Sequence, residues 1–356
     1  MNILNKVNNT LSALISINST SGREREILEF IEKRLRKSGF LIKRQDVDQE
    51  RYNLIVEGKG ETLISCHVDT VPPAGMKKPY SAVRKNGKIY GRGASDVKGP
   101  ISCLLVAMER FTEVKNPENF PFWVAFVVDE EKNSALGSEM LAKLLKDKVS
   151  RCLVLEPTNG RICTSQMGSL EFTLTVKGQG SHASEFEKVE NPARVLMDII
   201  SLLEKSVNRS VNVLQIRAGR GIYAVPETAL ALLEVKIFRE EDWKEIWERL
   251  NGTVEEFKTG CHVSLKLEDA ENFMDFGSKE FAKELGGILE ESTGLKAVEG
   301  TMPSWTDAAN YHKNGIKCVV FSMADLRSSH TSGECIDEAD LERMTLFFLK
   351  MFGIKK

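Results

Sequence analysis

Residues 62–69 (TLISCHVD) contain a short β-type run, Thr62–His67. Two further apolar runs, FWVAFVV at 122–128 and CLVL at 152–155, are typical of strands buried in a sheet that is covered on both faces. Between the first run and the run at 122–128, residues 99–112 have the pattern of a buried helix, with Pro100 near its start where a missing N–H donor costs nothing. This succession predicts an α/β domain with a mixed sheet flanked by helices.

The pattern changes at about Gly168, where SLEFTLTVKGQG alternates apolar and polar residues like a strand with one solvated face. Helix-like and strand-like segments follow in an order that predicts an inserted α+β (ferredoxin-like) domain of β-α-β-β-α-β type. After about residue 272 the helix–strand alternation of the first half resumes. We therefore expect a discontinuous catalytic domain, 1–167 and 273–356, and an inserted domain, 168–272. The segments on which this rests are helices at 192–206, 240–259, 279–293 and 338–352, and strands at 227–239, 262–269 and 316–323.

The composition is that of a globular protein with two domains of ordinary size. The chain has 356 residues, of which 42% are hydrophobic and 28% charged, with a net charge of -2. That balance argues against a nucleic acid or an anionic membrane as partner. The N-terminus lacks the features of a signal peptide, and no apolar run approaches the roughly 18 residues of a membrane span. Seven cysteines without a CxxC pair indicate buried thiols in a reducing compartment, so we expect a cytoplasmic protein.

Histidines and acidic residues recur just after the predicted strands. His67 ends one strand, and His330 lies in a polar, turn-rich segment near another. The carboxyl edge of an α/β sheet is where ligands and catalytic groups gather, so these loops should bring their side chains together. The acidic residues in equivalent places are Asp69, Asp96, Glu130, Glu131 and Glu156.

Such a cluster requires cations, because several carboxylates in contact repel one another unless positive charge neutralises them. Mixed imidazole and carboxylate ligands suit Zn²⁺ and related divalent ions. Two such ions can share an acidic ligand and clamp an oxyanion, while an unliganded carboxylate serves as general base. The pattern therefore predicts a hydrolytic centre with two metal ions.

The same residues resemble the M20 family of metallopeptidases and deacylases. His67–Pro72 (HVDTVP), Tyr90–Gly99 (YGRGASDVKG) and Asp129–Glu131 (DEE) are similar to three of its motifs in the family's order. Three more follow: Glu156-Pro157-Thr158, Gly180–Ser184 (GSHAS), and His330-Thr331 followed by Glu334. Jointly these motifs are specific, although each alone is weak. The resemblance implies a zinc-hydrolase-like catalytic domain.

The resemblance also implies roles. Asp96 would bridge two metal ions, with His67 and Glu156 completing one site and Glu131 and His330 the other. Glu130 would be the general base for attack by a metal-bound hydroxide and then the general acid for the leaving amine. Asp69 would contact the imidazole of His67 and fix its tautomer. Zn²⁺ fits the ligands best, and Co²⁺ or Mn²⁺ would accept them too.

His182 lies in the inserted domain. In similar enzymes this domain also mediates dimerisation, and the histidine reaches a partner's active site to stabilise the oxyanion. The resemblance thus implies a homodimer through the inserted domain, with His182 as a catalytic residue.

The substrate is less well defined by the residues. Family members hydrolyse N-acyl amino acids or short peptides, and many deacylases hold the substrate carboxylate with an Asn and a downstream Arg. Tyr223 stands at the Asn position, and the basic residue is Lys236 or Arg239. Length and GRGASDVKGP resemble acetylornithine/acetyl-lysine deacetylase and succinyl-diaminopimelate desuccinylase-type enzymes. The primary hypothesis is therefore N-acyl-amino-acid deacylation, the first alternative a di- or tripeptidase, and the alternative from another class a catalytically silent metal-binding module.

Several residues have competing structural interpretations. Asp307 is either near the active site or the N-cap of a short helix, and the sequence favours neither. Gly91, Gly93 and Gly99 are interpreted as turn residues that shape the loop presenting Asp96. The remaining two histidines, His262 and His312, fall outside every motif and are expected at the surface or in structural positions. Trp243 and Trp247 are expected on the core face of a helix.

Overall fold

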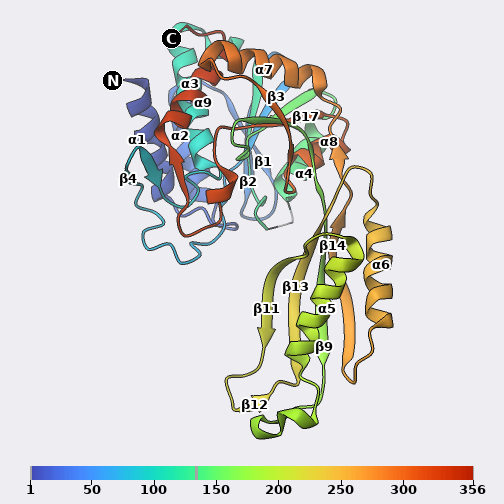
Figure 1. The fold of residues 1–356 in the computed structure, drawn as a ribbon. Coiled ribbons are helices and arrows are strands. Elements are labelled where there is room, and N and C mark those ends of the chain that lie inside the picture. The colour runs from blue at the N-terminus through green and yellow to red at the C-terminus, as the bar shows by residue number, and fades with distance from the viewer. Residues whose placement is uncertain (1, 133–134, 356) are drawn as a thin grey trace. The chain divides into compact units, whose positions relative to one another are not determined.

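The computed structural model describes residues 2–132 and 135–355. The chain divides into two compact units, which Figure 1 shows coloured from the N-terminus to the C-terminus. The first unit contains the residues up to Ser165, Asp275–Met302 and the residues from Thr306 onward. The second contains Gln166–Met274 together with Pro303–Trp305. Each unit has its own apolar core and is described separately below.

The first unit is built on a mixed sheet. Within the described residues its strands follow the order β1-β2-β6-β3-β7-β17-β8-β15, and β16 pairs with β8. β3 is parallel to β6 and β7, and β7 is parallel to β17, whereas β1–β2, β2–β6 and β8–β17 are antiparallel. The strands are β1 (Ile42–Asp46), β2 (Tyr52–Val56), β3 (Thr62–His67), β6 (Phe122–Val127), β7 (Arg151–Val154), β8 (Arg161–Gln166), β15 (Met274–Asp275), β16 (Val298–Met302) and β17 (Lys317–Val320).

Helices flank this sheet in two groups. In the first, α1, α3 and α9 contact one another and α7 contacts α9; in the second, α4 contacts α8, which packs on β7 and β17. The predicted α/β class with a mixed sheet and flanking helices is confirmed. The helices are α1 (Ile3–Ser16), α2 (Arg25–Lys37), α3 (Lys98–Val114), α4 (Leu136–Leu145), α7 (Lys279–Thr293), α8 (Ala308–Lys313) and α9 (Glu338–Met351). A small antiparallel sheet joins β4 (Val83–Lys85), β5 (Lys88–Tyr90) and β18 (Cys335–Asp337).

The second unit has the predicted β-α-β-β-α-β order. Its antiparallel sheet runs β11-β13-β9-β14, and helices α5 and α6 contact each other and pack against it. Its elements are β9 (Gly168–Lys177), β10 (Ser181–His182), α5 (Pro192–Val207), β11 (Asn212–Ala218), β12 (Ala224–Val225), β13 (Thr228–Ile237), α6 (Trp243–Glu256) and β14 (His262–Glu271).

The period-two pattern of β9 explains this packing. Leu170, Phe172, Leu174 and Val176 are fully buried, and the residues between them are half-exposed. On α6, Trp243 and Trp247 pack against the same core, and the Trp247 ring meets Phe172 edge-on at 5.8 Å between centroids. The two tryptophans therefore lie on the core face of their helix, as the sequence indicated.

Candidate metal centre

The carboxyl ends of three parallel strands bring the acidic and histidine side chains together. In the register of the sheet, His67 at the end of β3 lies opposite Val127 at the end of β6, and Ser65 lies opposite Val154 at the end of β7. The loop after β6 carries Glu130 and Glu131, and the loop after β7 carries Glu156. Strand order alone therefore places these residues at one edge of the sheet.

A separate loop between β5 and α3 delivers Asp96. Its shape depends on two glycines. Gly93 has a φ of +82°, and a Cβ on Gly99 would lie 2.4 Å from the carbonyl oxygen of Ala94. Both positions therefore exclude larger residues. Gly93 is a turn residue as expected, whereas Gly99 is the second residue of α3, so its interpretation as a turn residue is wrong.

Two groups of ligand atoms meet at Asp96. His67, Asp96 and Glu156 form one group, and Asp96, Glu131 and His330 form the other; within each group the ligand atoms lie within 4.8 Å of one another. In the first, the Nε2 of His67 is 3.2 Å from Asp96 Oδ1 and 3.7 Å from Glu156 Oε1. In the second, the Nε2 of His330 is 3.4 Å from Asp96 Oδ2 and 3.0 Å from Glu131 Oε2. The two oxygens of one carboxylate thus face two different imidazoles.

The electrostatics show how much negative charge this site concentrates. Burial and the charge of Asp96 raise the pKa of Glu156 to about 8, although the charge of His67 acts in the opposite direction. Hydrogen bonds to Asp96 and Glu131 raise the pKa of His330 to about 10. The Asp96 pKa is lowered because bonds to His330 and His67 outweigh the effect of its burial. Protons on the imidazoles and carboxyls therefore balance the charge when cations do not.

The residues fit divalent cations. Oε1 of Glu156 is buried and forms no hydrogen bond with any residue in the described part of the chain. Deprotonated carboxylates and neutral imidazoles direct lone pairs toward the centre of each group and place no hydrogen-bond donor there. Such a centre binds a cation in preference to a neutral ligand. Two divalent cations sharing Asp96 would satisfy all five side chains.

Glu130 lies beside the two groups without belonging to either. Its pKa is raised well above the usual range by burial and by the charges of Glu156, Glu131 and Asp307. Among the residues that the structure describes, none forms a hydrogen bond with its carboxylate. A carboxyl with a raised pKa, free of the ligand groups, can both accept and donate a proton.

Asp69 organises the residues around it. Its carboxylate accepts the main-chain N–H of Glu130 at 3.2 Å and of Glu131 at 3.1 Å, and the Ser21 hydroxyl at 2.7 Å. The Nδ1 of His67 lies 3.0 Å from the main-chain oxygen of Asp69 and 3.6 Å from its carboxylate. The sequence suggested the Asp69 carboxylate as the acceptor for His67, but the main-chain oxygen of Asp69 is the closer one. A proton on Nδ1 of His67 therefore faces this oxygen, and Nε2 faces the other ligand atoms.

The turn that carries Glu130 is strained and braced. Asp129 has a φ of +74°, in the left-handed region that side chains rarely adopt. Arg51 donates to its carboxylate at 2.5 Å, and the N–H of Ala135 donates to its main-chain oxygen at 2.9 Å. Neither Ser21 nor Arg51 was expected at the site from the sequence. Each comes from a polar loop with no pattern to mark it.

Asp307 is buried at the N-terminus of α8, but its side chain caps no main-chain N–H there. It accepts instead from the Ser138 hydroxyl of α4, and its second oxygen has no partner among the described residues. Burial, opposed by the bond from Ser138, raises its pKa to about 7. Asp307 therefore occupies the N-cap position of α8 without forming a capping bond, and its carboxyl interacts with the charge of His67 in the first ligand group.

Comparison with known proteins agrees with this geometry. Residues 63–353 match the family described as peptidase family M20/M25/M40. The chain belongs to this M20 family. It is 27% identical over 376 residues to a succinyl-diaminopimelate desuccinylase of Methylorubrum extorquens, covering 94% of this chain and 95% of the relative.

Solved structures show the same fold. Human carnosine dipeptidase 1 superposes with a TM-score of 0.77 at 15% identity, over 99% of this chain and 97% of that one. A dinuclear metal binding peptidase of the M20 family from Bacillus subtilis gives 0.68 at 17% identity, over 98% and 97%. The M20 chain is therefore a metal-dependent hydrolase of amide or peptide bonds that uses two divalent cations. None of its described helices is long and apolar enough to cross a membrane.

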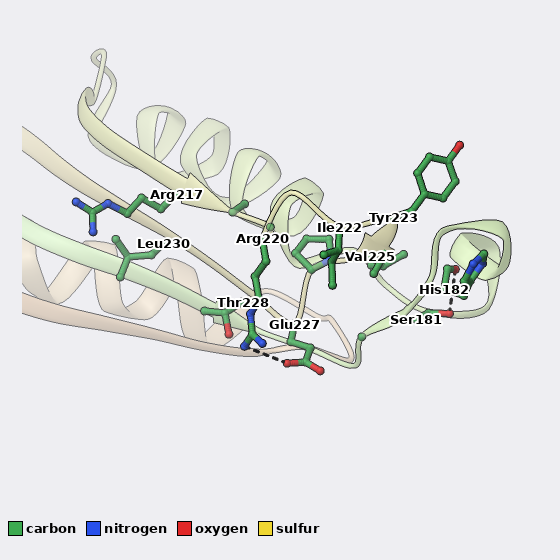
Figure 2. Close-up of a pocket in the computed structure, with 15 residues that line it drawn as sticks. Ser181, His182, Arg217, Arg220, Ile222, Tyr223, Val225, Glu227, Thr228 and Leu230 are labelled. Atoms are coloured by element: carbon green, nitrogen blue, oxygen red, sulfur yellow. Dashed lines mark hydrogen bonds and ion pairs between the residues drawn. The ribbon is translucent and has the colours of Figure 1, made fainter.

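The second unit of the M20 chain carries the other residues singled out from the sequence. His182 and Tyr223 line a pocket of about 620 Å³, and their rings lie 6.4 Å apart between centroids. Figure 2 shows Tyr223 pointing away from the loop that carries it, and the side chain is 83% exposed. The main-chain N–H of Ser184 donates to Nδ1 of His182 at 3.2 Å, which leaves Nε2 as the protonated nitrogen.

Lys236 and Arg239 are not brought together with Tyr223. Lys236 lies near the far end of β13, where it pairs with Glu234, and Arg239 stacks over the Phe273 ring at 4.6 Å. Tyr223 precedes the near end of this strand, roughly 25 Å away at about 3.3 Å per residue. Within one copy of this unit, Tyr223 and either basic residue therefore cannot hold the same small carboxylate. His262 is exposed on β14, and His312 packs edge-on against Phe276, in line with structural roles.

Proposed function

We propose that this M20 amidohydrolase removes the acyl group from an N-acyl amino acid, in the manner of acetylornithine or acetyl-lysine deacetylases. The observation that carries the proposal is the pair of ligand groups meeting at the two oxygens of Asp96, with the unliganded Glu130 beside them. Such a site acts on a linear amide bond. The relative named succinyl-diaminopimelate desuccinylase, aligned over nearly the whole chain, supports an N-acyl amino acid as substrate.

The ligands are assigned by position. His67 and Glu156 would hold one cation, Glu131 and His330 the other, and Asp96 both. When bound, the cations polarise the substrate carbonyl and lower the pKa of the attacking water. Glu130 takes a proton from that water and passes it to the leaving amine, a role that its raised pKa suits. Asp69 holds the turn on which Glu130 sits.

We propose Zn²⁺ as the native cation, with Co²⁺ and Mn²⁺ as substitutes. Two imidazoles among three carboxylates suit zinc, and first-row ions of similar charge accept the same ligands. We also propose a cytoplasmic location. Its support is the state of the seven cysteines, which are free thiols, five of them buried.

A homodimer through the second unit completes the proposal. β11 is an edge strand of its sheet, and every residue of it is exposed, including the apolar Val213, Leu214 and Ile216. An edge with apolar side chains is suited to pairing with another copy. In such a dimer His182 would reach the partner's site, where its protonated Nε2 could donate to the developing oxyanion.

The second candidate function is that of a di- or tripeptidase. It is favoured by the fold similarity to human carnosine dipeptidase 1 and to a Staphylococcus aureus tripeptidase. A peptidase needs a subsite for the free α-amino group of its substrate, whereas a deacylase needs none.

One substrate panel distinguishes these functions. The chelator-stripped protein is reloaded with Zn²⁺ or Co²⁺ and assayed on N-acetyl and N-succinyl amino acids and on unblocked dipeptides and tripeptides. The proposal predicts a kcat/KM at least tenfold higher for an N-acyl amino acid than for any peptide. The reverse order would favour the peptidase. Hydrolysis of neither class by the fully loaded protein would favour a catalytically silent metal-binding module.

A further inference from the structure

A buried ion pair joins two loops of the metal centre. Arg92, in the loop before Asp96, donates from Nη1 to Oε2 of Glu334 at 2.5 Å, although 242 positions separate the two residues in the sequence. Both side chains are 1% exposed. Charges removed from water to this degree are stabilised only by close partners, so every polar contact of this pair carries weight.

Those contacts attach to the main chain of the site. The other oxygen of Glu334 accepts the N–H of Ser95 at 3.0 Å and of Asp96 at 3.1 Å. The carboxylate therefore holds the backbone of the residue that belongs to both ligand groups. On the other side, Nη2 of Arg92 donates to the main-chain oxygen of Pro73 at 3.0 Å and of Thr331 at 3.3 Å. Thr331 directly follows the ligand His330.

The two ligand groups depend on these contacts unequally. His67 ends β3 and Glu156 follows β7, and these strands are hydrogen-bonded neighbours in the buried sheet. His330 instead stands in a loop, with a φ of +61° and a side chain 52% exposed. The contact of Arg92 with Thr331 and the chain connection to Glu334 tie this loop to the backbone of Asp96, beside the bond from the Ser95 hydroxyl to the main-chain oxygen of Asp325.

We propose that Arg92 and Glu334 are a positioning pair that sets the spacing between Asp96 and His330, and so governs occupancy of the cation group formed by Asp96, Glu131 and His330. Neither residue belongs to a ligand group. The inference rests on the proposed function, because it takes the two ligand groups as cation sites.

The test is a cation titration of the chelator-stripped protein. Co²⁺ is added to wild type and to Glu334→Gln, and binding is followed by calorimetry and by visible absorption. We expect the wild type to take two equivalents. Glu334→Gln should bind the first within threefold of the wild-type affinity and the second at least tenfold more weakly. The Glu334→Asp variant keeps the charge and should recover part of the second affinity.

Two further variants make the test decisive. Arg92→Lys keeps the positive charge but loses the fork that reaches Glu334, Pro73 and Thr331 together, so it should weaken the second equivalent as well. If thermal unfolding of the cation-free protein shows that Glu334→Gln does not fold, the affinity of Arg92→Lys for the second equivalent tests the proposal. Glu109→Gln breaks the Arg34–Glu109 pair elsewhere in the first unit and should leave both affinities unchanged.

Equal weakening of both equivalents, or no weakening of either, would overturn the positioning role. Failure of the proposed function looks different. In that case the wild type would bind two equivalents, respond to these substitutions as described and hydrolyse no amide.

Discussion

The carboxylate of Asp69 accepts the main-chain N–H of Glu130 at 3.2 Å, although the two residues follow different strands. The same carboxylate also accepts from Glu131, while the main-chain oxygen of Asp69 faces Nδ1 of His67. One residue therefore sets the position of the proposed base Glu130, of Glu131 in one proposed ligand group and of His67 in the other. Buried polar groups with several partners hold a site to one geometry.

Substitution of Asp69 tests that organising role. Asp69→Asn replaces one acceptor oxygen with an NH₂ donor that must face a main-chain N–H, so the turn bearing Glu130 should shift. We expect kcat to fall about ten- to a hundredfold, as is usual when the partners of metal ligands are changed. Ser21→Ala removes only one of the three bonds to this carboxylate and should cost less than tenfold. A steady-state comparison of the two variants suffices, and equal effects would argue against the role.

The proposed base is tested by Glu130→Gln, which keeps the shape and removes the proton acceptor. Turnover should fall by about 10²–10⁴-fold because general acid–base assistance is lost. The cation content, measured by elemental analysis, should stay at the wild-type value because Glu130 belongs to neither ligand group. Loss of a cation in this variant would instead make Glu130 a ligand.

His182→Ala tests the contribution of the second unit. The imidazole Nε2 is the donor that the proposal places at the developing oxyanion, and losing one such donor costs about 10²–10³-fold in kcat. Cation content should be unchanged, because the ligand atoms come from the first unit. Substitution of the other histidine of the second unit, His262→Ala, is a matched control. A near-wild-type rate for His182→Ala would end the hypothesis.

Asp307 predicts a pH-dependent stability. Its pKa is raised from 3.8 to about 7 by burial, so the folded protein keeps this proton between these pH values while the unfolded chain releases it. Stability should therefore fall as the pH rises from about 4 to about 7, by up to about 1.4 kcal/mol per pH unit, and then level off. Asp307→Asn removes this titration.

Urea unfolding of the cation-free proteins at several pH values provides the measurement. The stability of Asp307→Asn relative to wild type should increase from pH 4 to pH 7 and remain constant above. Asp147→Asn removes an exposed carboxylate and should show no such trend. Parallel profiles for wild type and Asp307→Asn would show that Asp307 is already ionised in the folded protein at low pH.

The sequence predicted the buried strands and the acidic and histidine residues at their ends. It did not predict the residues that form hydrogen bonds to the loops carrying them. Buried strands such as Phe122–Val127 are continuous apolar runs, and parallel order then places whatever follows them at one edge. Edge strands carry no such signal. Every residue of Asn212–Ala218 is exposed, so no alternation of buried and exposed residues marks that strand. The edge strand Ile42–Asp46 is mostly polar and charged, and Ile42 is its one buried residue.

The supporting residues were harder to predict because their partners are distant in the chain. Ser21 contacts Asp69 from the loop between α1 and α2, and Arg51 contacts Asp129, which follows β6. Arg92 and Glu334 both lie in quoted motifs, yet nothing in either motif indicates that they pair. Such contacts depend on loop conformations that only the folded chain defines.

If Asp96 joins two cation sites, anomalous scattering from crystals of the zinc-loaded protein should show two zinc peaks, one on each side of the Asp96 carboxylate. His67 and Glu156 should complete the first site, and Glu131 and His330 the second. A single peak, or zinc bound by other residues with Asp96 contacting none, would contradict it.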